Sequence, residues 1–157
     1  AYEALYPPAN KRMLSAIQRG QVPTEYFRLL AVALDSARLC GSCIYCELGP
    51  VDNPDMIAEV ADLLLRHEEA SWSLCWGRHN GRILLSLRTS ATDARADHVI
   101  RRIVSRKGTS GGHDAMAGGQ IPLGETTARE QKRLDTLIRK RYFRATGNDP
   151  ASCRKLV

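Results

Sequence analysis

The pattern of apolar and polar positions predicts two helices at the start of the chain. Residues 11–19 and 24–38 carry apolar side chains at the three- and four-residue spacing of a helix. The second segment follows Pro23, and Thr24 is expected to be its N-cap. One apolar face of this segment is predicted to contain Phe27, Leu30, Ala31, Leu34 and Ala37. The two segments predict a helical lead-in ahead of the first strand.

Three further segments predict strands. Residues 39–48, LCGSCIYCEL, are rich in small and β-prone side chains and stop at Gly49-Pro50. Residues 72–78 and 82–89 are apolar and lie on either side of His79-Asn80-Gly81. Because Asn-Gly is the strongest short hairpin signal, these two segments are predicted to form antiparallel strands.

The remaining segments predict three more helices and one short strand. A helix is expected to begin at Asn53-Pro54, since proline suits the first helical position. Its buried stripe is predicted to contain Met56, Val60, Leu63, Leu64 and His67. A second helix runs from Asp93 to about Arg106, and a basic helix runs from Thr126 to about Arg144. Residues 119–123 predict a strand between these two helices.

The predicted order is β-α-β-β-α-β-α after a helical N-terminal lead-in. Such an order is typical of an α/β (α+β) fold, here a mixed β-sheet of about four to five strands flanked by helices. The 157 residues correspond in size to one ordinary domain. Residues from Gly147 onward are expected to form a frayed tail.

The composition is that of a soluble globular protein. Hydrophobic residues make up 43% of the chain and charged residues 25%, which argues against a disordered or membrane protein. No stretch approaches the roughly 20 apolar residues of a membrane-spanning helix. The first residues also lack the apolar segment of a signal peptide. We therefore expect a cytoplasmic protein with no membrane partner.

The positive charge is concentrated near the C-terminus. Residues 1–100 contain 10 Lys and Arg against 12 Asp and Glu, a net charge of −2. Residues 101–157 contain 13 against 5, a net charge of +8. Clustered cations attract phosphates, which predicts an anionic partner. A solvated basic helix explains the same pattern equally well.

The five cysteines raise the alternative of a metal-binding or redox module. Cys40, Cys43 and Cys46 show the spacing C-x-x-C-x-x-C. In a strand, however, residues three apart point to opposite faces and do not converge on one ion. An odd number of cysteines without a signal peptide also argues against a disulfide framework. We expect these residues to be reduced and buried in the core.

The glycine-rich stretch KGTSGGHDAMAGGQIPL contains the clearest candidate for ligand binding. Gly111-Gly112 would allow positive φ angles and bring backbone N–H groups close to an anion. The ring of His113 can donate to a phosphate. Asp114 is expected to cap a short helix whose amides point to the same place. A purely structural turn explains these residues as well.

Two motifs taken together resemble the DHH-associated domain of DHH-family phosphoesterases. The strand RILLSLRTS resembles that domain's strand ending in Ser-Leu-Arg-Ser, and Ser-Gly-Gly-His followed by Ala117-Gly118 resembles its Gly-Gly-Gly-His signature. The resemblance covers about residues 39–145, and the segment is similar to bacterial oligoribonuclease and pAp phosphatase proteins. It implies a substrate-binding domain at 39–146, with residues 1–38 as a linker from an N-terminal catalytic domain and residues 147–157 as a tail.

The resemblance also implies a set of substrate- or phosphate-binding residues. An arginine suits the central position, since its planar fork meets two phosphate oxygens at once. Ser110 replaces the first glycine of the signature and Thr89 replaces the serine after the arginine, which affects substrate choice more than phosphate binding. The implied binding residues are Arg88, Thr89, Ser90, Ser110, Gly111, Gly112 and His113.

The function implied is substrate binding for a metal-dependent hydrolase of phosphodiester or phosphomonoester bonds. The partners expected are a nucleotide or short RNA or DNA, and a DHH catalytic domain that holds manganese. Asp97-His98-Val99 is a near match to Asp-His-His, but it lies in a helical pattern and is interpreted as helix surface. The chain alone is thus expected to contain no catalytic residue and to be inactive. A stand-alone nucleic-acid-binding module is the alternative, and homodimerisation stays open.

Overall fold

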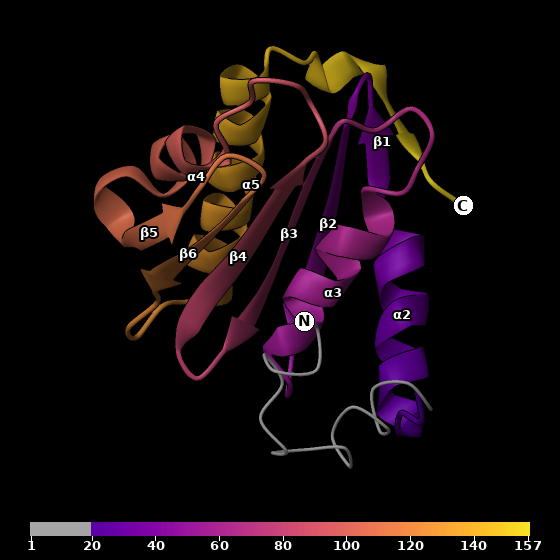
Figure 1. Cartoon of the computed structure of the whole chain (residues 1–157). Helices are drawn as coiled ribbons and strands as arrows, with labels where there is room; N and C mark the ends of the chain where they lie inside the picture. The colour runs from indigo at the N-terminus through magenta and orange to yellow at the C-terminus, as the bar shows by residue number, and fades with distance from the viewer. Residues whose placement is uncertain (1–19) are drawn as a thin grey trace, which may run out of the picture.

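The computed structural model describes residues 20–157, in which helices cover both faces of one β-sheet (Figure 1). The helix predicted at residues 11–19 lies outside this range. The elements in chain order are α2 (Thr24–Ser36), β1 (Arg38–Cys40), β2 (Cys43–Pro50), α3 (Asp55–Leu64), β3 (Trp72–His79), β4 (Arg82–Thr89), α4 (Ala96–Val104), η2 (Ser105–Lys107), β5 (Thr109–Gly112), β6 (Met116–Pro122), α5 (Ala128–Thr146), η3 (Pro150–Ser152) and β7 (Cys153–Lys155).

The sheet is mixed and has seven strands in the order β5-β6-β4-β3-β2-β1-β7. Strands β2 and β3 are parallel because α3 crosses over between them, and every other neighbouring pair is antiparallel. Asn80 and Gly81 turn the β3–β4 hairpin with positive φ angles of 47° and 69°, which confirms the predicted hairpin. The mixed α/β class is confirmed, but the predicted number of about four to five strands is lower than the seven in the sheet. Strands β1, β5 and β7 have only three or four residues and show no readable alternation.

Each face of the sheet has its own core. Helices α2 and α3 pack on one face, and α4 and α5 pack on the other (Figure 1). Alternation along β4 separates the two sides: Ile83, Leu85 and Leu87 belong to the α4–α5 core, so Ser86 and Arg88 point to the α3 side. Within residues 20–157, no helix is long and apolar enough to span a bilayer.

Two predicted helical faces differ in detail from the structure. Along α2 the large side chain of Phe27 is 61% exposed, whereas the small Ala33 and Ala37 lie against the sheet. The helix therefore approaches the sheet closely through alanines. Pro23, not Thr24, occupies the N-cap and makes no side-chain cap bond. In α3, Met56, Val60 and Leu64 are buried as predicted. Ile57 is buried as well, whereas the predicted Leu63 is exposed.

The C-terminal residues are an ordered strand rather than the frayed tail expected. Helix α5 begins with a capping box between Thr127 and Glu130 and ends at Gly147, which has a φ of 70°. The chain then turns through η3, and β7 pairs with β1 at the sheet edge. The sequence pattern missed β7 because the strand pairs only with residues that precede it by more than 100 positions.

A disulfide corrects the expectation that all core cysteines are reduced. Cys40 in β1 and Cys153 in β7 are register partners on adjacent antiparallel strands and are joined by a disulfide. Cys43, Cys46 and Cys75 are free and buried, as expected for core residues. The spacing of cysteines along the sequence could not reveal that residues 113 positions apart are cross-strand neighbours.

Candidate functional site

Arg88 lies near the end of β4 and points toward α3. Its Nε donates to the carboxylate of Asp62 at 2.6 Å, and its Nη1 donates to the hydroxyl of Ser86 at 2.8 Å and to the carbonyl of Leu87 at 3.0 Å. The Arg88 side chain is only 14% exposed, whereas that of Asp62 is 61% exposed. Within residues 20–157, Nη2 has no hydrogen-bond partner. The guanidinium is thus held in place, and only its Nη2 nitrogen is free.

A hollow of about 400 Å³ lies beside Arg88 and is called the Arg88 pocket below. The first turns of α3 form one wall, and strands β4, β6 and β5 form the floor and the other wall. Four of the predicted binding residues line it: Arg88, Gly111, Gly112 and His113. The other lining residues are Pro54, Ile57, Ala58, Leu84, Leu85, Ser86, Met116, Ala117 and Gly118.

The two glycines belong to an edge strand, not to the anion-binding turn expected. In β5, Gly111 pairs with Gly118 and Gly112 with Ala117. Because β5 is the last strand of the sheet, part of its backbone N–H and C=O groups face away from β6 and are available to a ligand. Packing explains Gly112: its φ is 155°, and a Cβ there would lie 2.4 Å from the Cβ of Ala117.

His113 forms the turn between β5 and β6 with its imidazole exposed. Its backbone N–H donates to the carbonyl of Met116 at 2.9 Å. In the described part of the chain, the ring has no hydrogen-bond partner, so both nitrogens are accessible to a ligand. No helix follows Asp114, which corrects the predicted cap. Instead, its carbonyl accepts from Ala96 at 3.0 Å and its carboxylate lies 3.4 Å from Arg95.

The other three predicted residues lie outside the Arg88 pocket. Ser110 lines a neighbouring hollow of about 390 Å³ above β5 and β6. Thr89 is buried; its hydroxyl donates to the carbonyl of Ser71 at 2.8 Å and accepts from the amide of Ala91 at 3.1 Å. Ser90 is exposed and uses its backbone N–H to bond Ser71. The geometry therefore gives Thr89 a structural role at the strand end.

Sequence reasoning missed Asp62 and Ser86, which hold the guanidinium of Arg88. The signal for Ser86 was present, because residues two apart on a strand share a face. Asp62 could not be linked to Arg88, since the contact depends on how α3 crosses the sheet.

Replacing Gly112 by alanine should destabilise the β5–β6 hairpin. The new Cβ would lie within 2.5 Å of both Ala117 and the carbonyl oxygen of Met116. We expect a loss of more than about 1 kcal/mol in the free energy of unfolding, measured by urea denaturation. Gly111→Ala is the matched control, because no atom beyond its two chain neighbours lies within 4 Å of its Cβ position. Equal stability of the two variants would contradict the observed packing.

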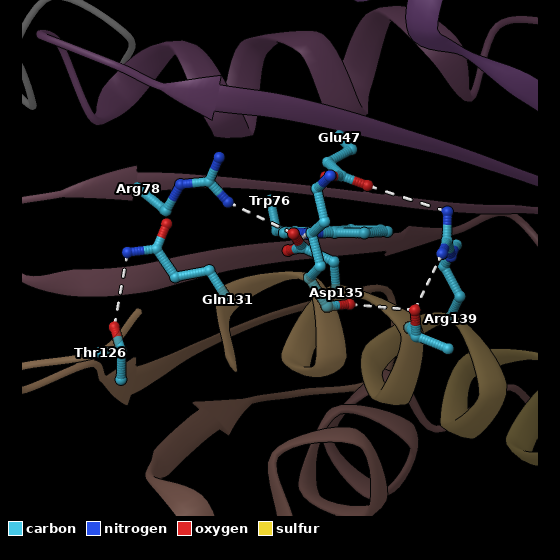
Figure 2. Close-up of polar contacts among 9 residues, drawn as sticks. Glu47, Trp76, Arg78, Thr126, Gln131, Asp135 and Arg139 are labelled. Carbon is cyan, nitrogen blue, oxygen red and sulfur yellow. Dashed lines mark hydrogen bonds and ion pairs between the residues drawn. The ribbon is translucent and has the colours of Figure 1, made fainter. Parts of the chain in front are cut away.

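A second cluster of charged side chains lies on the opposite face, between α5 and the sheet (Figure 2). The Oδ1 of Asp135 accepts from the indole N–H of Trp76 at 2.9 Å, and its Oδ2 accepts from Arg78 at 3.3 Å. Glu47 lies 3.9 Å from Arg139. Burial, and then the neighbouring Asp135 carboxylate, raise the pKa of Glu47. The cluster fixes α5 on β2 and β3 and does not contact the Arg88 pocket residues.

Metal-ligating residues do not converge within residues 20–157. No group of three or more His, Cys, Asp or Glu side chains there is arranged to hold a metal ion. Asp97 and His98 lie in the first turn of α4, and His98 is exposed, as the helix-surface interpretation predicted. A hydrogen bond from Arg95 lowers the pKa of Asp97.

Comparison with known proteins gives a consistent family and fold. Residues 41–140 match the DHHA1 domain. An uncharacterized protein of Methanocaldococcus jannaschii is 30% identical over 125 residues, which are 79% of this chain but 25% of that protein. The chain thus spans about a quarter of the length of this relative.

Two solved structures share the fold. An exopolyphosphatase-related protein from Bacteroides fragilis aligns with a TM-score of 0.57 and 13% identity over 87% of this chain and 41% of that one. The DHH domain of a member of the S1p family of ribosomal proteins aligns with a TM-score of 0.52 and 11% identity over 82% and 33%. Since the DHHA1 match covers more than half of the sequence, the chain belongs to the DHHA1 domain family, the DHH-associated domain.

Proposed function

We propose that the Arg88 pocket binds a phosphate group of a nucleotide or short nucleic acid, as the substrate-binding domain of a DHH-family phosphoesterase. The observation that carries this proposal is the convergence of Arg88 and His113 on one glycine-walled hollow. They come from a strand end and a turn that lie 25 residues apart. An arginine fork, an imidazole and an edge strand supply complementary donors to phosphate oxygens.

Asp62 occupies part of the position that a phosphate would take. Its carboxylate accepts a hydrogen bond from Nε of Arg88. A bidentate anion would bind the guanidinium edge formed by Nε and Nη2, so it would need this same nitrogen. Because Asp62 is 61% exposed, displacing it returns the carboxylate to water. Asp62 thus acts as an internal competitor that a doubly charged phosphate can replace at small cost.

Hydrolysis would be carried out by a DHH catalytic domain elsewhere in the full-length protein. The manganese expected for this activity would be held by that catalytic domain. Among residues 20–157, no set of metal ligands converges that would fit it. In this arrangement the DHHA1 domain contributes binding energy that orients the scissile bond, and no step of bond cleavage uses its own side chains.

The alternative, a nucleic-acid-binding module without a hydrolytic partner, is supported by the basic charge of α4 and α5. The two functions differ in ligand size. A substrate pocket should bind mononucleotides and dinucleotides, whereas a module that only grips the backbone should bind long strands alone.

Substitutions around Arg88 test the proposed function. Arg88→Lys keeps the charge but loses the fork, so we expect about a tenfold weaker affinity for adenosine 3′,5′-bisphosphate. His113→Ala should weaken binding as well, without lowering the melting temperature, since its ring is exposed. Asp62→Asn should strengthen binding by removing the competing charge. Isothermal titration calorimetry measures all three, and unchanged affinity in both Arg88→Lys and His113→Ala would place the site elsewhere.

A further inference from the structure

The positive charge of residues 101–157 gathers on the face of the domain opposite the Arg88 pocket. The pocket is lined by α3, whereas α4 and α5 cover the other face of the sheet (Figure 1), and η2 continues the chain from α4. Arg141 joins the two helices by donating to the carbonyl of Ile103 at 2.8 Å. We call the exposed cations of this face the basic layer: Arg101, Arg102, Arg106, Lys107, Arg129, Lys132, Arg133, Lys140 and Arg144.

These cations form no ion pairs with the described residues. Among residues 20–157, no member of the basic layer lies within 4.0 Å of a carboxylate oxygen. Both acidic residues of α5 are used elsewhere: Glu130 closes the capping box with Thr127, and Asp135 is buried against Trp76. A solvated helix usually intersperses charges of both signs along its surface, so this arrangement favours an anionic partner.

Four of the cations form a stripe on the outer side of α5. At 100° per residue, Arg129, Arg133, Lys140 and Arg144 fall within about 60° of the helix circumference, opposite the buried Ile138. At 1.5 Å per residue the stripe is about 22 Å long, so it can contact several successive phosphates of one strand. A regular row of cations fits a phosphodiester backbone better than it fits a single small anion.

The C-terminal end of the stripe is concave. Lys140 and Arg144 border a hollow of about 390 Å³ that also includes Phe143 and Asn148. A lipid surface is a poor match for this face, because membrane-binding helices combine basic residues with exposed apolar ones. In the described part of the chain, the exposed large hydrophobic residues all lie outside α4, η2 and α5: Val22, Phe27, Val32, Leu34, Leu63, Met116 and Val157.

We propose that the basic layer is a second binding surface, which holds the backbone of a single-stranded nucleic acid longer than the nucleotide taken by the Arg88 pocket. Edge strand β5 lies between the two surfaces, since one of its faces borders the pocket and α4 packs against the strand. The surface recognises the charge and spacing of the phosphates, so its affinity does not depend on the base sequence. It stands on the α4–α5 face alone and does not require the proposed function.

The test is fluorescence anisotropy with a labelled oligouridylate of about 16 nucleotides, longer than the stripe. Lys140→Gln/Arg144→Gln should lower the affinity at least about fivefold and reduce the slope of log K against log salt by about 1.4 for two lost contacts. Arg28→Gln/Arg154→Gln is the matched control, because it removes the same charge from cations already paired with Glu25 and Glu69. This control should bind within about twofold of wild type.

Binding of adenosine 3′,5′-bisphosphate should be unchanged in Lys140→Gln/Arg144→Gln, which distinguishes this surface from the Arg88 pocket. Wild-type affinity for oligouridylate in this variant would overturn the proposal. An equal loss in the control pair would also overturn it, since net charge rather than this surface would then determine binding. Binding of the wild-type chain to anionic phospholipid vesicles, but not to the oligonucleotide, would likewise overturn it.

Discussion

Loss of the Cys40–Cys153 disulfide is expected to lower the free energy of unfolding by about 2–5 kcal/mol. The bond closes a loop with a sequence separation of 113, so its removal greatly increases the freedom of the unfolded chain. It also ties β7, a strand of only three residues, to the edge strand β1. Without it, β7 retains only a short ladder and should detach first.

The measurement is thermal unfolding with and without a thiol reductant. Wild type should lose on the order of 10 °C in melting temperature on reduction. Cys40→Ala/Cys153→Ala should unfold at the lower temperature in both conditions, which separates the cross-link from general effects of the reductant. An identical melting temperature for oxidised and reduced wild type would contradict a stabilising role for this disulfide.

Replacing Asp135 by alanine is expected to lower the free energy of unfolding by about 3 kcal/mol. Asp135 is only 3% exposed and accepts from both Trp76 and Arg78. Its removal leaves the buried indole N–H without an acceptor, so the folded state is destabilised by the full desolvation cost of that group. The contact between α5 and β3 should loosen, which can be followed by the tryptophan fluorescence of the chain, to which Trp72 and Trp76 both contribute.

Asp135→Asn separates the hydrogen bond from the charge. The amide oxygen still accepts from Trp76, and the negative charge beside Glu47 is lost. Because the Asp135 carboxylate helps raise the pKa of Glu47, its removal should bring that pKa back toward the ordinary value. We therefore expect Asp135→Asn to be clearly more stable than Asp135→Ala in chemical denaturation. Equal losses would show that charge, and not the Trp76 hydrogen bond, carries the stabilisation.

The sequence predicts those elements whose signals are local. The Asn80-Gly81 hairpin, the helix after Pro54 and the basic helix α5 follow from turn chemistry and periodicity, and the structure confirms them. Strands β5 and β7 were missed because each is short and is defined by its neighbour rather than by its own composition. The segment predicted as one strand at residues 39–48 is divided into β1 and β2 by a turn at Gly41, whose φ is 59°. The disulfide was not predicted for the same reason, since Cys153 comes close to Cys40 only when β7 pairs with β1.

The candidate site shows the same limit. The family resemblance identified Arg88, Gly111, Gly112 and His113, and the fold brings them to one pocket. It could not show that Asp62 competes for Arg88, because that contact is set by the packing of α3 on the sheet. Nor did it separate pocket residues from neighbours such as Thr89, whose hydroxyl supports the loop around Ser71.

The most direct test of the Arg88 pocket is an NMR titration of the ¹⁵N-labelled chain with adenosine 3′,5′-bisphosphate. We expect saturable shifts of the Arg88 Nε–H signal and of the amides of Gly111, Gly112 and His113, with no comparable change on α2. Release of Asp62 should be visible at Arg88 because its Nε–H changes acceptor. Shifts confined to other parts of the chain, or saturation with an unaltered Arg88 signal, would contradict phosphate binding at this pocket.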